Sequence, residues 1–260
     1  MAQVISLFLF LFIFLWPHTA PLAATPLELS AQKTLEWHRD DHKITAAGNV
    51  KITQGDISLS CDQVSATYRD GAKQNKFLPQ LLTAQKNVII TSPDGTAYGD
   101  QVVYNVPDQK AVMTGESLRM ISGDMILYAA GKFEYQTQKG ELSASENVRL
   151  VQTTKETTNT LTADHMTAFF GKESDDAGKK RILQRLEASG NVVITTPTET
   201  ISGQQGVYHK AQNTAELSGN VRIVRGENTL EGDHATVDLN TNISTLSGGT
   251  GRVKGVFFPE

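Results

Sequence analysis

The segment His38-Arg39-Asp40-Asp41-His42 has the residue types that bind metal ions. On a helix, two histidines four positions apart lie on one face and can chelate a cation. Here the segment falls between two stretches with strand-like alternation, where the same spacing spans roughly 13 Å of extended chain. We therefore interpret it as a solvated turn, with a metal site as the alternative.

Aspartates recur at corresponding positions of the chain, and they are Asp62, Asp100, Asp164 and Asp233. Some repeat proteins bind calcium through such residues, but in a glycine-rich aspartate repeat that this sequence lacks. We favour hydrogen bonding of these carboxylates to backbone groups at bends. The residues that follow two of them, His165 and His234, fall at outward positions by two-residue alternation, so we expect polar surface residues there.

The single cysteine, Cys61, follows Ile57 and Leu59 at every second position, which is typical of a small buried hydrophobe rather than a reactive thiol. No Ser-His-Asp order, phosphate-binding glycine loop or paired-cysteine spacing rises above chance. The sequence therefore predicts a protein that is not an enzyme, with no catalytic residue, no metal site and no cofactor.

The elements that carry these residues are built from a repeated motif, in which a small or charged residue and Asn precede an alternating apolar segment. Its copies are Gly48-Asn49-Val50-Lys51-Ile52, Lys86-Asn87-Val88-Ile89-Ile90, Glu146-Asn147-Val148-Arg149-Leu150, Gly190-Asn191-Val192-Val193-Ile194 and Gly219-Asn220-Val221-Arg222-Ile223. Gly and Asn tolerate positive φ, which suits a bend in a strand. A chain of such copies predicts an array whose function lies along the stack.

Alternation on both sides of each Asn predicts strands that bend at the motif and keep one apolar face inward. A second bend follows 13 residues later in four copies, at Asp62, Asp100, Gln204 and Asp233, and turn signals lie between the two bends. Each unit is thus one bent strand out and one back. We expect loops inserted at Arg69 to Gln80 and Gly171 to Arg181, and a degenerate copy around Gly115-Glu116-Ser117-Leu118 and Ala130-Gly131.

Bent antiparallel strands stack into a folded sheet, here with roughly 14 passes and an apolar trough inside. Two interpretations stay open, a closed core filled by side chains or a groove wide enough for a lipid; many inward alanines favour the groove. The groove residues that we expect are Ile44, Ala46, Val50, Ile52, Leu59, Val64, Leu82, Val88, Ile90, Val102, Tyr104, Met113, Leu142, Val148, Leu150, Met166, Leu186, Val192, Ile194, Tyr208, Leu217, Val221, Ile223 and Val237.

The ends of such a sheet are open edge strands. The N-terminal segment Leu27 to Ala31 is bland, and nothing near Val253 to Phe258 indicates a capping helix, although natural sheets usually block such edges. We therefore expect pairing with another chain through these edges, including head-to-tail self-association.

The first 24 residues have no charged side chain, and the apolar run Val4 to Trp16 is shorter than the roughly 20 residues of a membrane span. We expect residues 1–24 to be a signal peptide cleaved after Ala24, with a retained anchor as the alternative, and residues 25–260 to form the repeat domain.

The net charge of −4, with Lys and Arg scattered among acids, indicates no nucleic-acid partner.

With Pro26 to Gln32, Thr45 to Gly55 and Cys61-Asp62-Gln63-Val64, and with the recurring Asn and Asp bends, the mature chain resembles the LptA/OstA-like family of lipopolysaccharide-transport proteins. The resemblance implies an all-β fold, a repetitive antiparallel β-jellyroll or β-taco, whose apolar groove holds the acyl chains of lipopolysaccharide in the periplasm. It also implies edge-strand docking to an inner-membrane LptC-like protein and an outer-membrane LptD-like translocon.

Three functions stay open from the residues alone. The first is a lipid conduit between inner and outer membranes, in soluble form or as a membrane-anchored LptC-like component. The second is a carbohydrate-active β-solenoid, although the carboxylates are spread over bends and loops and do not cluster on one face. The third is a structural filament module without lipid, which open edges alone would suit.

Overall fold

A computed structural model describes residues 26–70, 77–175, 178–238, 240–241, 243–249 and 251–258, and throughout them the regular structure is β-strand. The predicted signal peptide, residues 1–24, lies outside this part of the chain. Within the described residues there is no helix of a length and hydropathy that would cross a membrane. The strands are β1 (Glu28–Ser30), β2 (Thr34–His38), β3 (Lys43–Gln54), β4 (Ile57–Asp70), β5 (Phe77–Ser92), β6 (Gly95–Asn105), β7 (Lys110–Thr114), β8 (Leu118–Ser122), β9 (Met125–Ala129), β10 (Lys132–Gln136), β11 (Glu141–Thr153), β12 (Thr158–Asp175), β13 (Gly178–Thr195), β14 (Thr200–His209), β15 (Thr214–Arg225), β16 (Asn228–Asp238), β17 (Ile243–Ser247) and β18 (Lys254–Val256).

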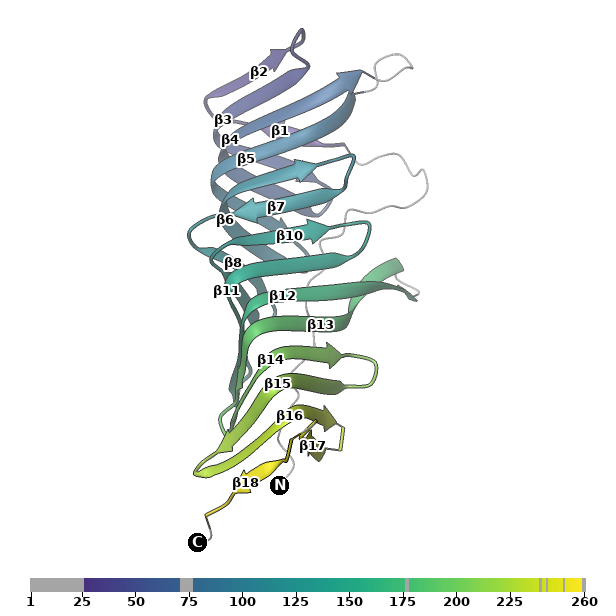
Figure 1. Ribbon diagram of the computed structural model, residues 1–260. Coiled ribbons are helices and arrows are strands. Elements are labelled where there is room, and N and C mark those ends of the chain that lie inside the picture. The colour runs from purple at the N-terminus through teal and green to yellow at the C-terminus, as the bar shows by residue number, and fades with distance from the viewer. Residues whose placement is uncertain are drawn as a thin grey trace.

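The strands form one 18-stranded antiparallel meander. Four passes are split into two short strands each, β1 with β2, β7 with β8, β9 with β10 and β17 with β18, so the sheet makes 14 passes. Figure 1 shows them stacked along one axis from β2 at the top to β18 at the bottom, each pass folded across two arms. The first arm contains the residues before each motif Asn and their pairing partners, and the second arm contains the residues after it and their partners. The fold is therefore the folded antiparallel sheet that the alternation predicts, and the all-β β-jellyroll that the family resemblance implies.

The Asn motif bends each long strand by placing two consecutive residues in the left-handed region of φ. Gly190 and Asn191 have φ of 74° and 50°, and the other four motif pairs have the same signs. In β13 these two residues face Gln204 of β14 alone, because the register shifts between Ser189 and Val192. The motif is thus a repeated β-bulge that keeps both arms facing inward, as its composition predicts.

The aspartates of the second bend connect neighbouring units. Asn87 Nδ2 donates to Asp62 Oδ2 at 2.9 Å, and Asn191 Nδ2 donates to Asp164 Oδ2 at 3.0 Å. Asp100 Oδ2 instead accepts the backbone N–H of Glu116 at 2.9 Å. The prediction of backbone partners is therefore right for Asp100 and wrong for Asp62 and Asp164, where the side chain of the next Asn lies within reach.

The two expected loop insertions are extensions of strands. Strands β12 and β13 are each 18 residues long and stay paired to Asp175 and Gly178, and β4 and β5 stay paired to Asp70 and Phe77. For these paired residues the loop prediction was wrong, because backbone pairing continues past the length of a normal unit. Residues 71–76 and 176–177 lie outside the described part of the chain.

The irregular copies coincide with the split passes. The expected degenerate copy separates β7 from β8 at Gly115 and β9 from β10 at Gly131, where no motif Asn stands. The last copy of the repeat, from Ile243 to Phe258, is interrupted after Gly248-Gly249 and resumes as β18, which pairs with the second arm of β16 at Leu230. These three irregular passes thus keep their two arms but lose continuous strand geometry at the bend.

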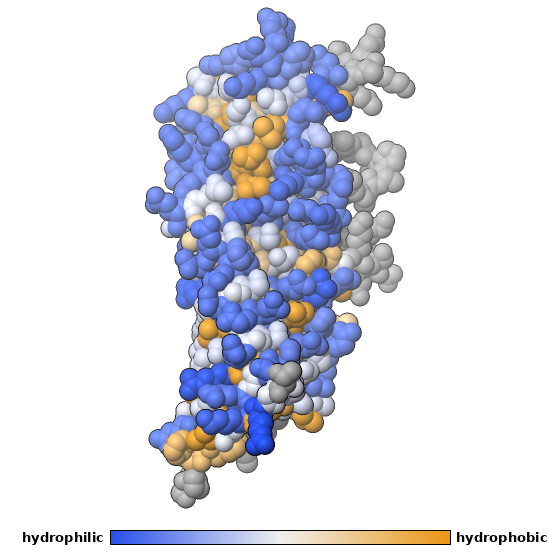
Figure 2. Space-filling model, viewed as in Figure 1, coloured by the Kyte–Doolittle hydropathy of each residue, from blue (hydrophilic) through white to orange (hydrophobic). Residues whose placement is uncertain are grey.

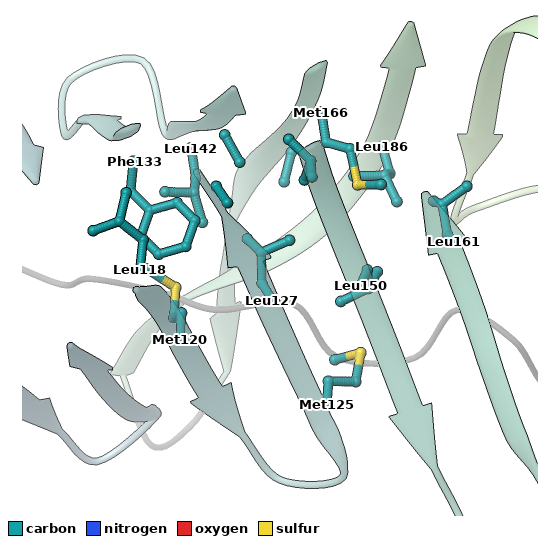
Figure 3. Close-up of a cluster of buried hydrophobic side chains, with 14 of the residues drawn as sticks. Leu118, Met120, Met125, Leu127, Phe133, Leu142, Leu150, Leu161, Met166 and Leu186 are labelled. Carbon is teal, nitrogen blue, oxygen red and sulfur yellow. The ribbon is translucent and has the colours of Figure 1, made fainter. Parts of the chain in front are cut away.

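The core is one apolar row along the inside of the fold. The residue that follows the bend is almost completely buried in six successive outgoing passes, at 1% exposure or less: Val50, Val88, Leu118, Val148, Val192 and Val221. Figure 3 shows Leu118 with Met120, Leu127 and Leu150, which continue this packing across β8, β9 and β11. Burial of this row gives the array its stability in place of disulfides.

Candidate functional site

Above this buried row the two arms enclose an apolar hollow. Ile52, Leu59 and Ile90 line it from the second arm, and Tyr104 and Leu142 line it from the first. Its empty space is about 130 Å³, comparable to cavities that stay dry and accept apolar molecules. Apart from Gln54, Thr137 and the Tyr hydroxyls, all its lining side chains are hydrocarbon or thioether, so it can hold an apolar group and offers little to a charged one.

The hollow lies in the N-terminal half of the stack. In the C-terminal half the inward residues leave smaller cavities, about 20 Å³ beside Leu161 and Tyr208 and about 10 Å³ beside Leu150 and Met166. Figure 2 shows an apolar patch in the upper part of the molecule between two hydrophilic flanks, and further apolar residues at the lower end. The hollow of about 130 Å³ thus lies in the N-terminal half of the trough.

All 24 residues expected in the groove lie on the inward face, but they occupy different depths. Eight line the hollow: Ile52, Leu59, Leu82, Ile90, Val102, Tyr104, Met113 and Leu142. Five form the buried floor instead: Val50, Val88, Val148, Val192 and Val221. The others are buried on the walls, except Ile44 at the partly exposed N-terminal end. The floor of the trough is packed, and its N-terminal half is hollow above the floor.

Sequence reasoning missed nine residues that line the hollow: Leu27, Gln54, Ile57, Ala97, Ala111, Met120, Phe133, Tyr135 and Thr137. Most of them follow from the register. Ala97 faces Ile90 and Tyr135 faces Leu142, so partners of expected groove residues were the available signal. Leu27 precedes β1, and only the three-dimensional course of the chain places it at the hollow.

The outer face is polar and held by charged contacts. Partial burial alone would raise the pKa of Glu134, but hydrogen bonds from Lys110 and Lys132, at 2.7 and 2.9 Å, and from Gln136 lower this pKa from 4.5 to about 2. Inside, burial raises the pKa of the Tyr104 hydroxyl. The fold therefore separates a charged exterior from a trough in which the ionised phenol is disfavoured.

Arginines stack on aromatic rings across neighbouring strands of the outer face. Arg119 lies 4.2 Å from the Tyr98 ring centroid and Arg149 lies 4.7 Å from that of Tyr128. Since Arg119 also faces Tyr128 in the register, the four side chains form a row over β6, β8, β9 and β11. The row ties the split passes to their regular neighbours.

The residues considered for chemistry are dispersed. His38 pairs with Glu36 at 2.9 Å and His42 pairs with Asp70 at 3.0 Å, and the described residues contain no group of three potential metal ligands. Cys61 is buried, and this burial raises the pKa of its thiol. His165 and His234 are exposed on the outer face, as the alternation predicts.

Both ends of the stack expose apolar side chains on edge strands. At the N-terminal edge, Leu35 and Trp37 of β2 are 58% and 59% exposed. At the C-terminal edge, Val256, Phe257 and Phe258 are likewise exposed. Apolar side chains at an unpaired edge are typical of surfaces that pair with another chain.

The fold and the trough define an open-ended antiparallel β-jellyroll with an apolar interior. Two successive segments, residues 30–131 and 129–243, match the family model described as LptA/(LptD N-terminal domain) LPS transport protein. The chain therefore belongs to this family of lipopolysaccharide-transport proteins, which is a family of transport proteins and not of enzymes. The two matches meet in the split pass β9–β10.

Among solved structures, the chain is similar to LptH from Pseudomonas aeruginosa, described as the LptA homologous periplasmic component of the lipopolysaccharide transport device. The identity is 11%, the match covers 90% of this chain and 96% of LptH, and the TM-score is 0.21. No curated protein matches the sequence.

Proposed function

We propose that this protein carries lipopolysaccharide across the periplasm by holding its acyl chains in the trough, after removal of residues 1–24. The observation that supports this most is the hollow of about 130 Å³, whose lining from both arms is almost entirely apolar. Each methylene group withdrawn from water contributes about 0.8 kcal/mol, so a few acyl chains suffice for tight binding without any chemistry.

The stack spans on the order of 65 Å, at about 4.8 Å per pass. Its open edges suit end-to-end pairing with an inner-membrane LptC-like protein and an outer-membrane LptD-like translocon, and with further copies of itself. The exposed Leu35 and Trp37 at one end and Phe257 and Phe258 at the other support this arrangement. The protein then forms all or part of a bridge between the two membranes.

The test compares two neighbouring residues of β5. Ile90 lines the hollow, and Ile89 points to the outer face. We expect Ile90→Asp to lose lipopolysaccharide that copurifies with the protein from its native envelope, measured by native mass spectrometry, because a carboxylate in the hollow opposes acyl chains. Ile89→Asp should keep it.

Unfolding curves of both variants check that the chain remains folded. Wild-type protein without bound lipid, or equal lipid content in the two variants, would refute the conduit. A structural filament module would give that lipid-free result, with end-to-end assembly unchanged.

A further inference from the structure

The inner face of the second arm is graded in polarity from the bend to the hairpin. One position after the motif Asn is the buried floor, and three positions after it is an apolar wall residue. Five positions after it, or at the corresponding place of β8, the residue is polar in six successive outgoing passes: Gln54, Ser92, Ser122, Gln152, Thr196 and Arg225. The outgoing passes from β3 to β15 thus each place a polar residue at the mouth of the trough.

Several members of this row stabilise the adjoining hairpins. Ser92 Oγ donates to the carbonyl of Gly95, Ser122 Oγ donates to that of Asp94, and Thr196 Oγ1 donates to that of Glu199. Such side-chain bonds are ordinary at turns and explain these polar residues without a ligand.

Gln152 of β11 differs from these. It is 6% exposed, and its Nε2 donates to Asp124 Oδ2 at 2.9 Å. Because an ionised carboxylate accepts hydrogen bonds and donates none, this contact fixes which end of the amide faces Asp124. The other end, Oε1, is buried with no hydrogen-bond partner.

Gln152 lies near the mouth of the trough, outside the residues that line the hollow. Gln152 lies between Met125 of β9 and Asn159 of β12 in the register, and both are buried. Leu150, two positions closer to the bend on the same strand, belongs to the apolar wall (Figure 3). A buried carbonyl oxygen without a donor costs free energy in the lipid-free protein, and a ligand that supplies a donor recovers it.

We infer that Gln152 Oε1 accepts a hydrogen bond from a hydroxyl or amide N–H group at the polar end of a bound acyl chain. This inference rests on the proposed function, and it requires the two arms to move apart beside Leu150, where the cavity is only about 10 Å³. Gln152 is then a specificity-determining residue, which favours hydroxylated or amide-linked chains over plain hydrocarbon chains of equal length.

The experiment measures binding of two probes, 3-hydroxytetradecanoic acid and tetradecanoic acid, by displacement of a fluorescent fatty acid from the purified protein. The probes differ by one hydroxyl group. We expect the wild-type protein to bind the hydroxylated chain about threefold to tenfold more tightly, as one hydrogen bond to a buried acceptor gives.

Gln152→Met keeps the length and flexibility of the side chain and removes the acceptor, so the preference should disappear. Gln85→Met, at an exposed outward position of β5, should keep it. If Gln152→Met does not fold, Gln152→Asn withdraws the carbonyl by one methylene and should likewise abolish the preference.

Each outcome decides between the two proposals. If the wild-type protein binds both probes equally, or if Gln152→Met keeps the preference, the role of Gln152 is overturned and the conduit stands. If the wild-type protein binds neither probe and carries no copurified lipopolysaccharide, the conduit fails and the role of Gln152 fails with it.

Discussion

Replacement of the motif asparagines should separate two contributions to the bend, backbone conformation and the bond between units. Asn87 and Asn147 have φ of 51° and 49°, so alanine is strained similarly at both. Asn87 donates to Asp62, whereas the pass before Asn147 has Gly131 in place of the aspartate. The two sites therefore differ in the side-chain bond and share the backbone geometry.

The magnitudes follow from these contacts. The left-handed conformation costs alanine about 1 kcal/mol relative to asparagine or glycine. An exposed amide–carboxylate bond contributes about 0.5 to 1 kcal/mol. We expect Asn87→Ala to lower the free energy of unfolding by about 1.5 to 2 kcal/mol and Asn147→Ala by about 1 kcal/mol. Asn87→Gly should cost about 0.5 to 1 kcal/mol and Asn147→Gly almost nothing.

Scanning calorimetry of the four variants measures these differences, with roughly 2 to 4 °C in Tm per kcal/mol for a chain of this size. Calorimetry is preferred to denaturant curves because repeat arrays can depart from two-state unfolding. If alanine is harmless at both sites, the conformational argument is wrong. If Asn87→Gly and Asn147→Gly are equally harmless, the bond to Asp62 contributes nothing.

Three further predictions concern charge, the floor and the edge. Because the pKa of Glu134 is lowered to about 2, the stabilisation by its carboxylate is present above pH 4.5 and is lost as the pH falls from about 4.5 to 2. Glu134→Gln should remove about 1 to 2 kcal/mol of this pH-dependent free energy of unfolding after solvent screening, seen as a flatter profile of Tm against pH. An unchanged profile would contradict the ion pairs. Val192→Ala should lower the free energy of unfolding by about 2 kcal/mol and the neighbouring outward Val193→Ala by less than about 1 kcal/mol, measured by thermal unfolding, and equal losses would show that the floor is not tightly packed. Leu35→Ser at the N-terminal edge should weaken pairing with an upstream copy or partner in analytical ultracentrifugation and leave Tm unchanged, whereas unchanged pairing would count against docking at this edge.

The sequence was sufficient to predict the array. Alternation fixes which side chains face inward, and the Asn motif fixes where each strand bends, because both are local properties of the backbone. All 24 expected groove residues accordingly lie on the inward face, and the φ values of Gly190 and Asn191 agree with the expected bend. The family resemblance was confirmed by the family match over two successive segments.

Depth within the trough was decided only by the tertiary structure. Ile90 and Ile194 both stand three positions after a motif Asn, yet Ile90 lines the hollow and Ile194 is buried beside a cavity of only about 20 Å³, because the distance between the arms depends on every pass of the stack. The extension of β12 and β13 also escaped prediction, since polar residues form a strand wherever a neighbour completes their backbone pairing.

The partners of the polar residues were likewise set by the fold. Asp62 and Gln152 meet Asn87 and Asp124 across 25 and 28 residues of chain, and only the stacking of units brings these groups together. The sequence by itself thus determined a bent, repetitive sheet with an apolar inner face. The tertiary structure decided where that face is hollow and which buried oxygen is left without a donor, because both depend on contacts between residues far apart in the chain.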